Sequence, residues 1–168
     1  TLSLLDGSSF SAEGLFVSSG SIIGQGTFIG NSANIRLSTC DVPSFITDSR
    51  VQGGAFHSIT AKGTLFSEDC SFSASSFEDC SFQKATAHMN GDTFFNGTLT
   101  MDSSRLLFTE STTVSLTNLT INSLNSVIKN EGTLQLRNCK SHVPLENRGE
   151  LISSFSDLDD LSSFGTFK

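Results

Sequence analysis

Two acidic pairs are the residues of this chain best placed to do chemistry. The segment Glu68-Asp69-Cys70-Ser71-Phe72 is echoed ten residues later by Glu78-Asp79-Cys80-Ser81-Phe82. Paired carboxylates at equivalent positions of a stacked sheet can line up and hold a calcium ion through their oxygens. Carboxylates on one face can also serve as the acids of a polysaccharide-cleaving solenoid enzyme. The simpler interpretation, which we prefer, is that acids at corners keep a coil soluble and stop sheets from adhering.

Four cysteines, at positions 40, 70, 80 and 139, are the next candidates. We expect buried free thiols, because unpaired cysteine is among the most buried residue types. A Cys70–Cys80 disulfide is a second option, and it needs an oxidising compartment and Cα atoms within about 7 Å. A structural zinc site is the weakest option, since no two cysteines have the spacing of two to four residues that common zinc ligands show.

The other reactive residue types are scattered. His57, His88 and His142 are far apart in sequence, and no Gly-x-Ser-x-Gly nucleophile elbow is present. Two segments, Asn96-Gly97-Thr98 and Asn118-Leu119-Thr120, fit the glycosylation sequon, which is a common pattern. We therefore predict a non-enzymatic protein with no catalytic residue, no metal and no cofactor.

A short repeated sequence motif indicates the strands that position these residues. Gly63-Thr64-Leu65-Phe66 recurs as Gly97-Thr98-Leu99-Thr100, as Gly132-Thr133-Leu134-Gln135 and, more weakly, as Gly149-Glu150-Leu151-Ile152, and residues 113–118 read like 133–138. The implied unit of roughly 15–20 residues is the length of one solenoid coil. Apolar and polar residues alternate within it, as in a strand with one buried face, and turn-forming Asp, Asn and Ser follow.

We therefore predict an all-β fold, a right-handed parallel β-helix of about 8–9 coils, the hand following from the chiral preference of parallel connections. Fifteen Phe with no Trp and no Tyr fit this fold, because Phe fills a core without needing a hydrogen-bond partner. An internal stack is predicted for the phenylalanines at positions 56, 66, 72, 77, 82, 94, 95 and 108. The alternative is an exposed Phe row that binds a partner.

The pattern divides the chain into zones. Residues 1–152 are predicted to form one β-helical domain, with irregular first coils in 1–50 and clear repeats in 51–152. Residues 153–168 are acidic, with apolar residues three apart, and are predicted to form a short helical or irregular cap, or a tail. Because the chain begins Thr1-Leu2-Ser3 without Met, we expect a segment excised from a longer protein.

The formal net charge of −7 and the single, scattered basic residues argue against some partners. Nucleic acids and anionic membranes are bound by clustered Lys and Arg, so we predict no nucleic-acid partner. No apolar run is long enough to predict a transmembrane segment.

Two short motifs resemble a known family. Gly53-Gly54-Ala55-Phe56 and Phe28-Ile29-Gly30-Asn31 resemble the Gly-Gly-Ala-hydrophobic and Phe-x-x-Asn repeats of the chlamydial polymorphic membrane proteins. The resemblance implies an autotransporter passenger, displayed on the bacterial cell surface or outer membrane or secreted, that acts in adhesion to host cells. It also implies that adhesion involves Phe28, Asn31, Gly53, Gly54, Ala55 and Phe56.

The same residues have a structural interpretation. Consecutive glycines let the backbone turn a tight corner with positive φ, Phe points inward, and Asn bonds backbone groups at a corner. An adhesive surface would then be the exposed face between corners.

Three functions stay open. The first is a binding rod that contacts a host or partner protein. The second is a structural solenoid that assembles into homo-oligomers or filaments. The third is a polysaccharide lyase or hydrolase, for which Asp69 and Asp79 are the main candidate acids.

Overall fold

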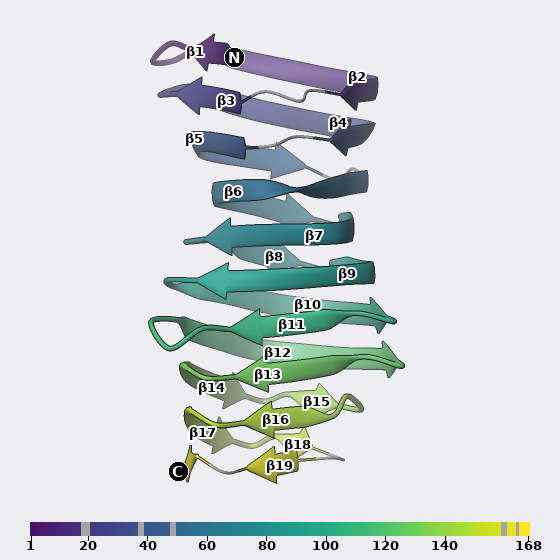
Figure 1. The fold of residues 1–168 in the computed structure, drawn as a ribbon, viewed down its shortest axis with the longest axis vertical. Coiled ribbons are helices and arrows are strands. Elements are labelled where there is room, and N and C mark those ends of the chain that lie inside the picture. Colours follow the sequence, from purple (N-terminus) through teal and green to yellow (C-terminus); the bar gives the residue numbers. More distant parts are fainter. Residues whose placement is uncertain (18–20, 37–38, 48–49, 159–160, 164) are drawn as a thin grey trace.

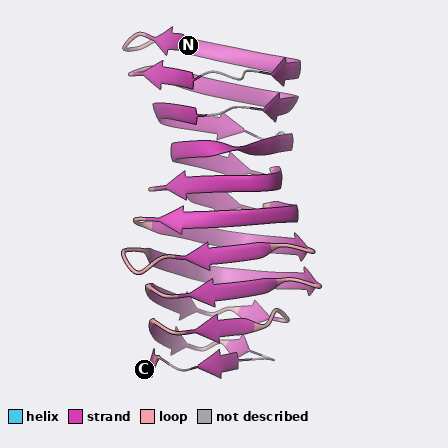
Figure 2. Cartoon of the chain, in the orientation of Figure 1, coloured by secondary structure: helices cyan, strands magenta, loops and turns pink. Residues whose placement is uncertain are grey.

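The computed structural model describes residues 1–17, 21–36, 39–47, 50–158, 161–163 and 165–168. Its strands join in one 20-stranded sheet in which every recorded pairing is parallel, and the described residues contain no helix (Figures 1 and 2). From N- to C-terminus the chain descends in Figure 1 while its near strands run right to left and its far strands left to right. That is a right-handed parallel β-helix, as the sequence predicts.

The strands of the N-terminal part are β1 (Leu2–Leu4), β2 (Ser9–Val17), β3 (Ser21–Gly24), β4 (Thr27–Arg36), β5 (Thr39–Thr47), β6 (Arg50–Lys62), β7 (Leu65–Ser73), β8 (Ser76–Glu78), β9 (Ser81–Asn90) and β10 (Thr93–Asp102). Those of the C-terminal part are β11 (Arg105–Phe108), β12 (Thr113–Leu124), β13 (Val127–Asn130), β14 (Thr133–Arg137), β15 (Lys140–Ser141), β16 (Leu145–Asn147), β17 (Glu150–Ser154), β18 (Asp157–Leu158), β19 (Leu161–Ser163) and β20 (Thr166–Phe167).

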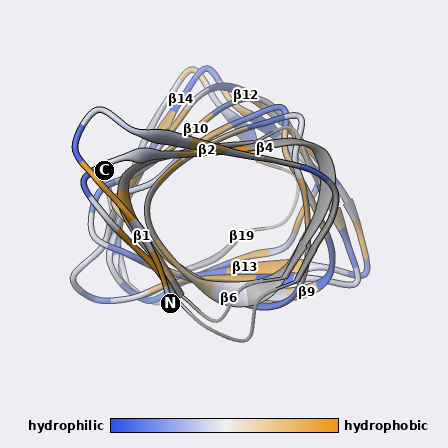
Figure 3. Cartoon of the chain, turned by 90° about the horizontal axis from the view of Figure 1, so that it is seen from above, coloured by the Kyte–Doolittle hydropathy of each residue, from blue (hydrophilic) through white to orange (hydrophobic). Residues whose placement is uncertain are grey.

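Each coil crosses three faces in turn. Face A contains β1, β3, β11, β13, β16 and β19; face B contains β8, β14, β17 and β20; face C contains β15 and β18. Longer strands bend around a corner, so β10 pairs with β8 on face B through its first half and with β9 on face C through its second half. Seen from above, the coils superimpose around one common axis (Figure 3).

The register is continuous along face A. One column of register partners runs through Leu2, Ile22, Cys40, Phe56, Phe72, Met89, Phe108, Asn130, Asn147 and Ser163. The steps range from 16 residues, between Cys40 and Phe56, to 22, between Phe108 and Asn130. From Ile22 to Asn147 the ladder makes about seven turns, slightly different from the coil number expected, and β1 and β19 extend it at either end.

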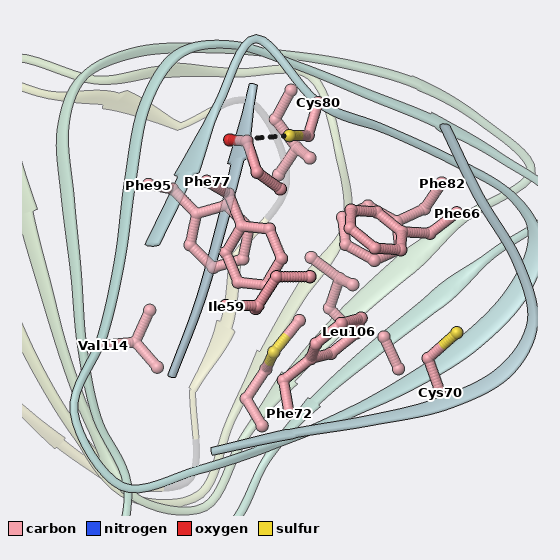
Figure 4. Packing of buried hydrophobic residues seen from close by; sticks show 14 of the residues in the cluster. Ile59, Phe66, Cys70, Phe72, Phe77, Cys80, Phe82, Phe95, Leu106 and Val114 are labelled. Carbon is pink, nitrogen blue, oxygen red and sulfur yellow. Dashed lines mark hydrogen bonds between the residues drawn. The ribbon is translucent and has the colours of Figure 1, made fainter. Parts of the chain in front are cut away.

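Inward-pointing Phe side chains fill the middle coils. Phe66 stacks on Phe82 with ring centroids 5.1 Å apart, and Phe77 stacks on Phe95 at 4.6 Å (Figure 4). Phe72 meets the edges of Phe66 and Phe77, at 5.1 Å each. Seven of the eight predicted core phenylalanines are at most 3% exposed.

The eighth, Phe94, was wrongly placed in the core. It is 53% exposed, whereas its neighbour Phe95 is 2% exposed. Successive side chains of a strand point to opposite faces, so two adjacent Phe residues cannot both point inward.

The repeated Gly-Thr-Leu motif predicts the pairing of strands on successive coils correctly in one part of the chain and wrongly in another. Residues 113–117 pair with 133–137, as the likeness of 113–118 to 133–138 predicts, and Gly132 leads into face B as Gly149 does. Leu65, in contrast, lies on face C, in one register column with Ser81 and Thr100. The motif marks the start of a strand after a corner, and each coil has several corners.

The two end zones also differ from expectation. Residues 1–50, expected to be irregular, contribute β1–β5 and the start of β6 to the same ladder within their described part. In residues 153–168, β18 pairs with β15, β19 with β16 and β20 with β17. The expected cap or tail is therefore a further coil, since its apolar Leu158 and Leu161 pack against the core cluster.

Candidate functional site

The six residues that the family resemblance implies in adhesion do not form one site. Phe28 lies on face B, fully buried and stacked on Phe10 at 5.7 Å, while Phe56 is buried on face A and stacked on Phe72. Gly54, beside the partly buried Ala55, has φ +117°, which agrees with the structural interpretation of the glycine pair. Their role in adhesion stays a prediction.

The two remaining residues of that set are placed only by their backbone. Asn31 lies in β4 opposite Glu13 of β2, and Gly53 lies in β6. The side chain of Asn31 and the surroundings of Gly53 lie outside the described residues.

The two acidic pairs lie at different corners and do not line up. Glu68 and Asp69 pair with Ala85 and Thr86 at the corner between faces C and A. Glu78 and Asp79 close face B, where Glu78 binds Lys62 at 2.7 Å and Asp79 Oδ1 accepts a hydrogen bond from the Thr98 N–H at 2.9 Å. The stacked-carboxylate hypothesis is therefore wrong in its geometry.

Metal-ligating side chains do not gather elsewhere in the described part of the chain. No three His, Cys, Asp or Glu side chains there come close enough together to hold a metal ion. His88 and His142 are both exposed, and the side chain of His57 is outside the described residues.

All four cysteines are free and buried, as the first of the three alternatives predicts. Cys70 and Cys80 lie at separate corners (Figure 4). Burial raises the pKa of the Cys80 thiol to about 11, against the opposing effect of backbone hydrogen bonds. Burial also raises the pKa of Cys139. A thiol with a raised pKa is a poor nucleophile at neutral pH, so these cysteines fill space.

The corner between faces B and C, which we call the B–C corner, repeats one backbone feature. From Gly63 onward, the residue at this corner has positive φ, in the left-handed region, on each successive coil: Gly63, Asp79, Gly97, Asn118, Asn138 and Phe155. Glycine, asparagine and aspartate are the residues that adopt this conformation at little cost. Phe155, with φ +54°, is the exception.

On its last three coils this corner forms an open groove among the described residues. This corner groove is open, has a volume of about 600 Å³, and is lined by three stacked tripeptides, residues 118–120, 138–140 and 155–157. The register of the third positions fixes the stack, because Thr120 pairs with Lys140 and Lys140 with Asp157.

Each tripeptide contributes three kinds of position to the corner groove. Its first residue is the left-handed corner residue, its second points inward, and its third points outward at the start of face C. The second positions form the floor, where the Cys139 N–H donates to Ser156 Oγ at 3.1 Å. The rim carries Lys140, Asp157 and the ring of Phe155, which is 93% exposed.

The sequence carries a signal for this groove that the repeated Gly-Thr-Leu motif does not reveal. Residues 113–118 and 133–138 align through Asn118 and Asn138, and continuing the register places Phe155 at the same position. A phenylalanine at a position that otherwise holds Gly, Asn or Asp is the anomaly that marks the site.

The fold defines the protein as a member of the parallel β-solenoid class. No protein-family model, no curated protein and no solved structure matches the chain. Among the described residues there is also no helix long and apolar enough to cross a membrane.

Proposed function

We propose that this chain is a non-enzymatic binding segment whose outer face B contacts a partner protein. The observation that supports the proposal is a continuous outward column on that face. Its members are register partners on successive coils: Thr60, Ser76, Phe94, Ser115, Gln135 and Ile152.

This outer column combines a flat surface with an apolar anchor. Adjacent coils are about 4.8 Å apart, so its six members extend for about 24 Å along the rod. Phe94, 53% exposed, lies between Ser76 and Ser115, and Ile152 is 36% exposed further along. Large aromatic side chains surrounded by small polar ones are typical of the energetic centre of protein interfaces.

The charge of the chain indicates the chemistry of the partner. With a formal net charge of −7, the rod attracts a basic surface at long range. Binding should therefore weaken as the salt concentration rises.

The placement of the candidate acids supports a binding function over the lyase or hydrolase alternative, because Asp69 lies at the corner between faces C and A and Asp79 lies at the B–C corner. Glu78 forms a salt bridge with Lys62 of the neighbouring coil, and Asp79 accepts a hydrogen bond from the Thr98 N–H. Both carboxylates thus support the corner that carries them. The resemblance to autotransporter passengers supports display on a bacterial surface, or secretion, as part of the same proposal.

The proposal is tested by adding the fluorescently labelled chain to cultured epithelial cells and measuring saturable binding by flow cytometry. We expect Phe94→Ser, which restores the serine found on both neighbouring coils, to weaken binding about tenfold or more. Leu124→Ser is the matched control, because Leu124 is 62% exposed on face C. Absence of saturable binding, or equal binding by Phe94→Ser and the parent chain, contradicts the proposal.

Sedimentation velocity over a range of concentrations tests the assembly alternative, which can use the same exposed Phe94. A chain that stays monomeric at high concentration leaves Phe94 available to a partner. Self-association that is abolished by Phe94→Ser makes the outer column an oligomer interface instead.

A further inference from the structure

We propose that the corner groove binds a neutral sugar residue, with the ring of Phe155 as the surface on which the sugar ring lies. The groove lies at the B–C corner, away from Phe94 on face B, so this inference goes beyond the proposed function and does not depend on it.

Phe155 combines an unusual backbone conformation with an exposed side chain. Left-handed corner residues recur in this fold, and elsewhere they are small or polar, such as Ala74 and Ser103. Phe155, with φ +54°, is the one aromatic residue among the described residues with positive φ, and a bulky side chain is an outlier in this region. Its ring is 93% exposed and therefore gains almost nothing by burial against its own chain. A residue that is strained and also unburied points to a role outside the folded chain itself.

Two asparagine side chains line the corner groove together with the ring of Phe155. Asn138 Nδ2 donates to Asn118 Oδ1 at 2.8 Å. This bond leaves the Asn118 amide nitrogen as a donor and the Asn138 carbonyl oxygen as an acceptor, neither with a partner among the described residues. Sugar hydroxyl groups both donate and accept, so they suit such a mixed pair.

The rim of the groove carries one positive and one negative side chain. Lys140 and Asp157 are register partners on adjacent coils, and no ion pair joins them within the described part of the chain. Their opposite charges cancel at the rim, so the groove presents a donor and an acceptor without net charge. The negative chain as a whole further disfavours anionic ligands.

Strand addition by a peptide is confined to one end of the groove. Thr120 and Lys140 are paired on both sides in the face C ladder, whereas β18 pairs with β15 alone among the described residues, so only the outer edge of β18 is open. The ring of Phe155 and the amides of Asn118 and Asn138 line the groove with side chains, and an aromatic face with mixed hydrogen-bonding groups matches the apolar face and hydroxyl edge of a sugar.

The experiment is saturation-transfer NMR with neutral trisaccharides of glucose, galactose and N-acetylglucosamine at millimolar concentration, followed by titration of any that bind. We expect Phe155→Asn to weaken binding about tenfold or more. Because Asn occupies this corner on the two preceding coils, the variant should melt at or above the temperature of the parent chain, which excludes unfolding as the cause. Phe94→Ser is the matched control and should bind sugar as the parent does.

Three results overturn the inference: no neutral trisaccharide binds, Phe155→Asn binds as well as the parent, or a sulfated trisaccharide or a short peptide competes more strongly than every neutral sugar. The two proposals fail separately. Loss of cell binding in Phe94→Ser with sugar binding intact supports both, and each readout can be negative while the other remains positive.

Discussion

The aromatic middle of the rod, residues 50–108, and the C-terminal coils, residues 113–158, solve the same stacking problem with different chemistry. In the middle, the face A column holds Phe56, Phe72, Met89 and Phe108, all at most 3% exposed. Beyond Phe108 the next two members are Asn130 and Asn147, which are equally buried. One register position is thus filled first by apolar side chains, most of them rings, and then by amides.

The amide part of the column is held by directed hydrogen bonds. Asn130 Nδ2 lies 2.7 Å from Asn147 Oδ1 and 3.1 Å from the carbonyl oxygens of Gly132 and Glu150. Asn130 Oδ1, at the junction with the aromatic part, is buried without a partner among the described residues. Rings stack by dispersion and tolerate small shifts, whereas amides require a matching donor and acceptor on the next coil.

The B–C corner changes along the same division. In the middle it is built from Gly63, Asp79 and Gly97, and in the C-terminal coils from Asn118, Asn138 and Phe155. The glycine corners leave no side chain at the surface, while the later corners project amides and a ring. The comparison explains why the groove lies where it does.

The largest expected effect tests the aromatic side of the comparison. Phe72→Ala removes a ring that contacts Phe56, Phe66, Phe77 and Phe82, and it should lower the free energy of unfolding by about 3–5 kcal/mol. Urea denaturation followed by far-UV circular dichroism measures it. The control Phe94→Ala removes an exposed ring and should change stability by about 0.5 kcal/mol or less. Equal losses from the two variants contradict the inward stack.

The next effect tests the amide side. Asn130→Ala removes a buried amide donor that lies within hydrogen-bond distance of Asn147 Oδ1 and of the carbonyl oxygens of Gly132 and Glu150, and it should cost about 2–3 kcal/mol, measured in the same way. The control is Asn138→Gly, which removes an exposed amide and keeps a residue that accepts φ +53°. Its cost should stay below about 1 kcal/mol. A cost for Asn130→Ala no larger than that of the control removes the amide column as a source of stability.

The sequence predicts the fold correctly where the two-residue alternation of side chains and the hydrophobicity of each residue indicate the same orientation. Alternation around residues 98–101 and 133–136 gives parallel strands, and Phe66, Phe72 and Phe82 are buried as their apolar character requires. The wrong placements have physical causes. Phe94 follows the side-chain alternation and not its own hydrophobicity, and Asn130 and Asn147 are polar residues whose burial becomes possible only when a neighbouring coil supplies partners.

The sequence signal for the groove becomes readable only when the register of the coils is known, for a related reason. The repeated motif marks strand starts on more than one face, so the alignment could not assign each corner to its column. Without that register, nothing distinguishes Phe155 from a residue of an acidic tail. The continuation of the ladder through β18, β19 and β20 is what places it on the corner.

A pH experiment compares one thiol from each region. Burial raises the pKa of Cys80 to about 11, so the neutral thiol is the form favoured by the folded state. Its contribution is fully present below the ordinary pKa of 9.0 and is lost as the pH rises toward 11, because the unfolded chain ionises first. A shift of about two pKa units corresponds to about 3 kcal/mol.

The measurement is the stability of the parent chain minus that of Cys80→Ala, between pH 8 and pH 11. This difference should shrink as the pH rises. Burial also raises the pKa of Cys139, but hydrogen bonds from neighbours including Ser156 oppose the rise, so Cys139→Ala should show a weaker trend. If the stability difference falls more steeply with pH for Cys139→Ala than for Cys80→Ala, then Cys80 of the aromatic coils does not have the more apolar surroundings.

The smallest effect concerns two glycines of the same corner. Gly63 has φ +60° and Gly97 has φ +78°. An alanine at either position would be strained by this positive φ, at a cost of about 1 kcal/mol in the free energy of unfolding. A Cβ at Gly63 meets nothing within 4 Å, whereas one at Gly97 would lie 2.3 Å from Asp79 Oδ1. Gly97→Ala must therefore also displace the carboxylate that accepts from the Thr98 N–H, which adds about 1 kcal/mol to its cost. The control adds Asp79→Ala to both variants. If the carboxylate causes the extra cost of Gly97→Ala, the two alanine variants should then cost the same. An extra cost that remains means that the backbone at Gly97 is itself more constrained than the backbone at Gly63.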